Sequence, residues 1–365
     1  MARPDILMGR RAFLATAAAA AATSMTGESA LGGGGGDERR AALLPAPTLE
    51  PARIVRRTAG LRPYRAGGIR LEAEPIGRKT VVHDYGHGGA GVTLSWGSAI
   101  AAADLVRDAA GPAAPVAVLG SGAVGLAAAK ILLERGHPVR VLARDFPPRT
   151  TSDLSGAVWL PVGVETGSSP AARERYLRIA ADSWRRFADL ASEDGRGVVR
   201  RTLYDSEGLP ALPPELAATR RSIERLPFPG RERSGVACET FLIEPPVYLP
   251  ALLRDVLVSG ATIAARTFRG PDDLAELREP AIVDCLGLGA GEVFSDAAVE
   301  PVRGQLVHLF PEDLPYLLSH RGGYVFPRRD AVILGGTFEH GVSDPTPDPA
   351  ACHAILERHR RFFST

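Results

Sequence analysis

The stretch that decides the fold is PVAVLGSGAVGLAAAKILLERGHPVRVLARD, residues 115–145. Its apolar start, 116–119, is typical of a strand buried on both faces of a sheet. The pattern G-x-G-x-x-G follows, and the Ala/Leu-rich segment 126–135 predicts a helix that stops before Gly136. A second apolar strand, 139–142, completes a βαβ unit of about thirty residues.

In this context the glycines have defined roles: a tight turn, close backbone approach to a pyrophosphate, and contact between helix and strand. The helix start adds partial positive charge. We predict a dinucleotide site with contacts from Gly120, Gly122, Ala123, Val124 and Gly125.

The residues after the second strand do not decide which dinucleotide binds. Arg144 could bind the 2′-phosphate of NADP, whereas Asp145 could hold the adenosine ribose of FAD.

Composition limits the remaining function classes. The chain has 365 residues, 45% apolar and 23% charged, which is enough for two domains. A net charge of +1 gives no reason to expect nucleic acid as a partner. The cysteines (Cys238, Cys285 and Cys352) lie far apart and no His/Cys cluster has ligand spacing, so we predict no metal.

The amino terminus is typical of a targeting segment. Within residues 1–30, GRRAFL at 9–14 and the Ala-rich run to Ala22 resemble a twin-arginine signal, with a run too short to span a bilayer. Residues 31–50 form a linker that contains five glycines at 32–36. We therefore expect the Tat export machinery as a partner and a periplasmic, cell-surface or secreted product. There the cysteines would form one internal disulfide at most, or stay as three buried thiols.

A second glycine-rich loop lies in VVHDYGHGGAGVTLSWG, residues 81–97. It predicts a strand, a loop and a helix that runs to about Arg107. Glycines at 86, 88, 89 and 91 leave little side chain to bury, so their use is backbone approach to something flat or anionic.

The rest of the chain predicts an α/β protein, α+β overall. Ser169 and Pro170 begin a helix with an apolar stripe, 198–243 is strand-like, and a helix covers about 247–259. Strand 281–285 runs into glycines from Gly287, strands are expected at 302–307, 323–327 and 332–339, and a helix at 349–363 ends the chain.

Taken together, these strings resemble the D-amino-acid oxidase and D-aspartate oxidase family. The matching strings are VAVLGSGAVGL, TTSDLSGAVWLP, DCLGLGA, VRGQ, YVFPR, VILGGTFE, GLRPYRAGGIRLE and VVHDYGHGGAGVTLSWG, which cover the chain from about residue 50 to its end. In the family the last two strings lie near the carboxyl terminus, whereas here they precede the dinucleotide strand. The sequence therefore looks circularly permuted, with the family's ends joined through 111–115.

The resemblance implies FAD as cofactor, a Rossmann-like FAD-binding domain and a mixed or antiparallel substrate domain. It assigns 51–80 to substrate-domain strands, 81–165 to the FAD-binding core, 166–280 mainly to the substrate domain, 281–300 to the FAD-binding domain, 301–345 to the substrate domain and 346–365 to the final helix.

It also implies site residues. FAD contacts would come from Arg144, Asp145, Thr150, Thr151, Ser152 and Gly287, and at the flavin pyrimidine end from Gly88, Gly89, Gly91, Val92 and Thr93. Arg62 would grip the substrate carboxylate and Tyr324 would add a hydroxyl, with Gly89 beside the reacting atoms. Without the resemblance, Arg62 would be read as a surface residue and Tyr324 as a core residue.

The implied reaction is oxidative deamination of a D-amino acid by hydride transfer from Cα to flavin N5, with dioxygen as second substrate and hydrogen peroxide as a product. The alternatives are a glycine or secondary-amine oxidase, an NADP-linked dehydrogenase or a non-catalytic flavin-binding protein. The sequence leaves open whether the chain acts alone or as a homodimer. Leu160 and His320 depart from the family pattern; His320 could favour an acidic substrate or lie on the surface.

Overall fold

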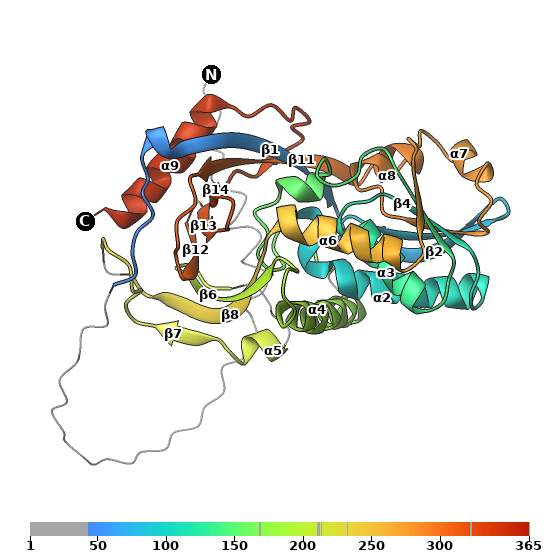
Figure 1. Ribbon diagram of the computed structural model, residues 1–365, viewed down its shortest axis with the longest axis horizontal. Helices are drawn as coiled ribbons and strands as arrows, with labels where there is room; N and C mark the ends of the chain where they lie inside the picture. Colours follow the sequence, from blue (N-terminus) through green and yellow to red (C-terminus); the bar gives the residue numbers. More distant parts are fainter. Residues whose placement is uncertain are drawn as a thin grey trace, which may run out of the picture.

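The computed structural model describes residues 43–167, 169–209, 212, 214–231, 233–321 and 323–364. The predicted signal segment and the five-glycine run lie outside these residues. The described chain forms two β-sheets with helices packed around them, drawn at opposite ends of the molecule in Figure 1. This mixed architecture confirms the predicted fold class.

The first sheet has six strands and contains the predicted dinucleotide unit. Its strands, in spatial order, are β2 (Arg70–Ile76), β3 (Lys79–Tyr85), β10 (Ala281–Asp284), β4 (Val116–Leu119), β5 (Val139–Ala143) and β9 (Thr262–Ala265). Every neighbouring pair is parallel except β2–β3. All residues of β4 and β10 are buried, as expected for central strands of a covered parallel sheet.

Four long helices pack together beside this sheet (Figure 1). They are α2 (Gly91–Ala110), α3 (Ala123–Glu134), α4 (Pro170–Ala191) and α6 (Pro245–Val258). The Ser169 side chain caps α4 by accepting from the Ala172 amide, as its sequence predicts. The helical segment Gly88–Ala110 is long and apolar enough to cross a membrane. However, 67% of its apolar 18-residue stretch is buried inside the protein, as in a core helix.

The second sheet has nine strands and curls around one end of the molecule (Figure 1). Its main order is β1 (Ile54–Arg65), β11 (Val299–Leu309), β14 (Val332–Gly335), β13 (Gly323–Pro327), β12 (Tyr316–His320), β6 (Val198–Asp205), β8 (Gly235–Ile243) and β7 (Arg221–Ile223), with β15 (Glu339–His340) beside β11. The pairs are antiparallel except β12–β6. Helix α9 (Pro349–Phe363) packs on β11, β13 and β14.

Short helices complete the connections. They are η3 (Pro51–Arg53), η4 (Gly88–Ala90), η5 (Thr151–Leu154), α5 (Pro214–Ala217), α7 (Asp272–Ala275) and α8 (Leu288–Val293). All three cysteines are free thiols, two of them buried.

Strand pairing places some segments differently from the sequence-based division. The segment 51–80 was expected to belong to the substrate domain, yet β2 turns at Gly77 (φ 59°) and pairs with β3 in the six-stranded sheet. In the same way β9, within 166–280, extends that sheet at its edge. The single strand expected at 332–339 is instead divided into β14 and β15. These differences arise because hydrogen bonding between strands, not local pattern, decides which sheet a strand joins.

The described chain begins beside its last helix. The Arg360 guanidinium on α9 donates to the Leu49 carbonyl at 2.6 Å, and the Leu44 amide donates to the Pro227 carbonyl at 2.7 Å. Leu44 and Leu49 pack against the same apolar cluster as Phe362. The start of the described chain is thus fixed close to its end.

Candidate functional site

The two glycine-rich loops predicted from the sequence lie side by side. Helices α2 and α3 begin next to each other, because β3 and β4 flank the same central strand, β10. A Cβ atom added at Gly91 would lie 3.9 Å from Cγ2 of Val124. Neither N-cap residue, Ala90 of α2 or Gly122 of α3, caps its helix with a side chain. Such a pair of helix starts suits the phosphates and ring oxygens of a dinucleotide.

The turn after β4 has a backbone that only glycine can adopt without strain. Gly120 has φ 107°, and a Cβ there would collide with the Cys285 carbonyl oxygen. A Cβ at Gly125 would collide with the Gly120 carbonyl oxygen. Gly287 (φ 61°) follows β10 on the same side, where its Cβ position is 3.6 Å from Pro63 of β1. The loop after β10 therefore packs on the dinucleotide turn and reaches the second sheet.

The segment Thr150–Ser152 lies at the start of α3. The Ser152 hydroxyl accepts from the Ala123 amide at 3.0 Å. Thr150 and Asp153 form a capping box for η5, in which the Thr150 hydroxyl donates to the Asp153 carboxylate at 2.6 Å. The sequence-predicted cofactor residues 120–125 and 150–152 are thus brought together.

Arg144 and Asp145 follow β5 at the same edge of the sheet. Their side chains form an ion pair at 2.7 Å, in which Arg144 is 78% exposed. The Ser121 hydroxyl donates to the Asp145 carbonyl, which holds this edge against the glycine turn. Asp145 is the less exposed of the two and lies closer to the turn.

The glycine-rich loop 86–93, called the second cradle below, is supported by buried polar groups. Asp84 and His87 are almost fully buried, and Nε2 of His87 lies 3.1 Å from the Ser98 hydroxyl. Burial raises the pKa of Asp84 to about 8, an effect that Asp284 reinforces, and burial lowers the pKa of His87 to about 4. Both groups are therefore neutral at neutral pH beneath the loop 86–93.

Thr93 differs in one respect from its expected role. Its hydroxyl donates to the carbonyls of Val158 and Leu160 at 3.3 and 3.4 Å. The side chain thus holds the 156–161 segment across the start of α2. Leu160, which departs from the family pattern, is buried there.

Arg62 lies between the second cradle and the nine-stranded sheet. Its Nη1 donates to the Thr337 carbonyl at 3.1 Å, and its guanidinium lies 5.1 Å from the centre of the Phe338 ring. A Cβ at Gly89 would be 3.6 Å from Cδ of Arg62, and a Cβ at Gly304 would collide with the guanidinium. Strand β1 thus places Arg62 at the boundary between the two sheets.

Tyr324 lies in the same part of the nine-stranded sheet. It pairs with Gly335 across β13 and β14, where any side chain at 335 would collide with its ring. Its hydroxyl is 2.8 Å from a Cβ position built on Gly156 and 3.6 Å from one built on Gly336. Sequence reasoning missed Gly304 and Gly335 as residues that make room for Arg62 and Tyr324. The signal was present in the strings VRGQ and VILGGTFE.

His320 does not lie on the surface, which was one of the two alternatives left open by the sequence. It is 3% exposed, and its Nε2 lies 2.8 Å from Nδ1 of His359 on α9. The cause is the packing of α9 on β11, β13 and β14, which no local pattern encodes.

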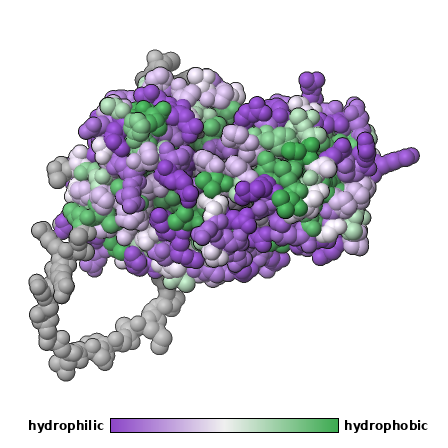
Figure 2. Space-filling view, viewed as in Figure 1, coloured by the Kyte–Doolittle hydropathy of each residue, from purple (hydrophilic) through white to green (hydrophobic). Residues whose placement is uncertain are grey.

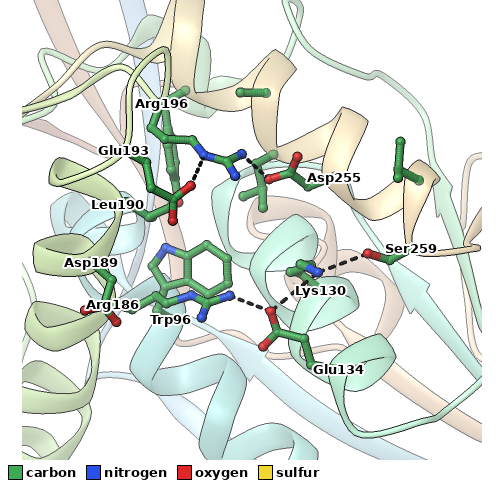
Figure 3. A pocket seen from close by; sticks show the side chains of 14 residues that line it. Trp96, Lys130, Glu134, Arg186, Asp189, Leu190, Glu193, Arg196, Asp255 and Ser259 are labelled. Carbon is green, nitrogen blue, oxygen red and sulfur yellow. Dashed lines mark hydrogen bonds and ion pairs between the residues drawn. The ribbon is translucent and has the colours of Figure 1, made fainter.

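The cavity shown in Figure 3, of about 340 Å³, lies away from these residues among α2, α3, α4 and α6. Its charged side chains pair with one another: Arg186 with Glu134 at 2.5 Å, and Arg196 with Glu193 at 2.6 Å. The cavity is therefore a charged gap between packed helices. The candidate site residues Arg62 and Tyr324 lie instead at the boundary of the two sheets.

A mainly parallel sheet whose G-x-G-x-x-G turn precedes a helix is the architecture of a dinucleotide-binding protein. Residues 115–365 match the family described as FAD dependent oxidoreductase, DAO. The chain belongs to this family, and it is an FAD-dependent enzyme. The resemblance inferred from the sequence is confirmed, and the NADP alternative is wrong.

Two curated relatives are named D-amino-acid oxidase. The protein of Streptomyces coelicolor is 31% identical over 249 residues, covering 67% of this chain and 76% of its own. That of Rubrobacter xylanophilus is 34% identical over 251 residues, covering 66% and 74%. The solved glycine oxidase of Geobacillus kaustophilus shares the fold, with a TM-score of 0.52 and 16% identity over 68% of this chain and 77% of its own.

Proposed function

We propose that this enzyme oxidises D-amino acids to 2-oxo acids, ammonia and hydrogen peroxide, with dioxygen and water consumed. The observation that carries the proposal is the placement of Arg62, which touches the Gly89 cradle on one side and Gly304 on the other. A guanidinium beside a flavin cradle is suited to an anionic substrate group. The names of the two bacterial relatives support a D-amino acid as the substrate.

In this proposal the chain's own residues bind and orient. The planar fork of Arg62 binds the substrate carboxylate through two parallel hydrogen bonds. The Tyr324 hydroxyl, on β13, adds a third donor. The substrate reacts as its free amine, whose proton is lost to solvent before hydride transfer, so no side-chain base is needed once the carboxylate is held with Cα against Gly89. FAD, when bound, supplies the hydride acceptor and passes the electrons to dioxygen.

The test is a peroxide assay of the FAD-loaded enzyme over matched D- and L-amino acids, together with glycine and sarcosine. Turnover of several D-amino acids with no turnover of their L-enantiomers is the expected result. Preference for glycine or sarcosine would favour the secondary-amine alternative, to which the fold of the glycine oxidase neighbour points. A yellow protein that releases no peroxide with any substrate would refute the proposal.

We further propose that the chain is a circular permutant of its family. The family match begins at Pro115, directly before the dinucleotide strand. Residues 54–110 supply β1 to the nine-stranded sheet, β2 and β3 to the six-stranded sheet, and the helix α2. The contact between Arg360 and Leu49 supports nearby ends. A reordered chain, 115–364 followed by 43–114, should fold and bind FAD; failure of this chain to bind FAD would count against permutation.

We also propose export by the twin-arginine route, on the basis of GRRAFL at 9–14. Replacing Arg10 and Arg11 together by lysine should leave the enzyme in the cytoplasm as an uncleaved precursor. Unchanged export of that double variant would refute this route.

A further inference from the structure

Two buried histidines connect α9 with the ends of β12 and β14. His320 closes β12 and is 3% exposed, and His359 on α9 has no exposed surface. Nε2 of His320 lies 2.8 Å from Nδ1 of His359, and Nε2 of His359 lies 3.1 Å from the Gly335 carbonyl oxygen. A hydrogen-bonded chain therefore runs from β12 through α9 to β14.

The proton position on His359 follows from its partners. Its Nε2 faces a carbonyl oxygen, so we assign the N–H of the neutral ring to Nε2, which donates to Gly335. Nδ1 of His359 is then an acceptor, and Nε2 of His320 donates to it. Nδ1 of His320 then faces the carbonyl of Arg321, an exposed turn residue. Burial lowers the pKa of His359 to about 3, and His320 and Arg358 act in the same direction. His359 is thus neutral at neutral pH, and the donor from His320 fixes the tautomer in which Nε2 of His359 carries the proton.

Gly335 connects the Nε2 donor of His359 to the candidate site. Its Cα lies against the Tyr324 ring, with no room for a side chain. Two residues further on, the Thr337 carbonyl accepts from Arg62 at 3.1 Å. Gly323, adjacent to Tyr324, also lets the His359 ring approach, because a Cβ there would be 2.8 Å from Cε1. The orientation of the Gly335 peptide therefore affects the positions of both the Arg62 and the Tyr324 side chains.

We infer that His359 is a positioning residue for the carboxylate site, acting through the Gly335 carbonyl, with His320 holding its tautomer. This inference rests on the proposed function, since Arg62 and Tyr324 must bind a carboxylate for the positioning to matter. His359 touches neither substrate nor cofactor in this role. Its loss leaves a buried carbonyl without its donor and frees the end of β14 to shift.

The test compares the FAD-loaded wild type with three variants. His359→Leu removes the donor, whereas His359→Gln can place an amide N–H near the position of Nε2. Leu356→Ala is the control, because Leu356 is buried in the same helix and lies in the apolar cluster under α9. The measurements are the Kd of benzoate, a simple carboxylate, from the change in flavin absorbance, together with KM, kcat and Tm.

We expect His359→Leu to raise the benzoate Kd and the substrate KM about fivefold or more, while kcat stays within about twofold. His359→Gln should restore most of the affinity. Leu356→Ala should lower Tm and leave the benzoate Kd unchanged.

Two results would overturn the inference alone: an unchanged benzoate Kd in His359→Leu, or an equal rise in Leu356→Ala, which would show a merely structural effect. A wild type that neither turns over D-amino acids nor binds benzoate would instead refute the proposed function, and this inference with it.

Discussion

Replacing Arg62 by leucine tests the proposed site most directly. The guanidinium makes two charge-assisted hydrogen bonds to the substrate carboxylate in the proposed complex, each contributing about 1.5–3 kcal/mol. Their loss costs about 3–6 kcal/mol, which lowers kcat/KM by about 10²–10⁴-fold. Leucine fits beside the Phe338 ring, which lies 5.1 Å from the guanidinium in the wild type, so the fold should persist. Flavin absorbance and a peroxide assay measure both properties in one sample.

Two companion variants sharpen this experiment. Arg62→Lys keeps the charge but not the planar fork, so its kcat/KM should fall between those of the wild type and Arg62→Leu. Arg57→Leu changes an exposed arginine on the same strand and should leave activity unaltered. If Arg62→Leu retained kcat/KM within about tenfold of the wild type while holding FAD, the assignment of the carboxylate site would be wrong.

Three other perturbations have defined outcomes. Tyr324→Phe removes one hydrogen bond to the substrate carboxylate, worth about 1.5–3 kcal/mol, so steady-state kinetics should show KM raised by about 10–100-fold with FAD retained; an unchanged KM would place the hydroxyl outside the site. Gly120→Ala should lower Tm and the flavin-to-protein absorbance ratio because its Cβ would collide with the Cys285 carbonyl; Gly136→Ala, with a similar φ but open space around it, should keep its FAD. The pKa of Asp84 is raised from 3.8 to about 8, so the folded state holds a proton that the unfolded state releases, and this group's contribution to stability falls by about 1.4 kcal/mol per pH unit between pH 4 and 8. Asp84→Asn should therefore gain stability relative to the wild type as pH rises through that window in urea unfolding, and parallel curves would contradict the shift.

The local elements of the site could be predicted from the sequence because their causes are local. Glycine spacing, the apolar run before it and the Gly136 stop define the βαβ unit within about thirty residues, and α3 ends at Glu134 as expected. The N-cap of α4 is equally local, since Ser169 and Ala172 are three residues apart. The family resemblance added Arg62 and Tyr324, which no periodicity distinguishes from ordinary surface or core residues.

Strand partners and side-chain destinations were decided by the tertiary structure. The central position of β10 between β3 and β4 brings two glycine loops together across long sequence separations, and only the folded sheet shows it. The same holds for β2, which joins β3, and for His320, whose partner on α9 is 39 residues away. The sequence by itself determined the cofactor cradle and its chemistry, because turns and caps depend on neighbouring residues. The tertiary structure decided which strands pair and what stands beside Arg62, because pairing and packing depend on contacts between segments that the chain order keeps apart.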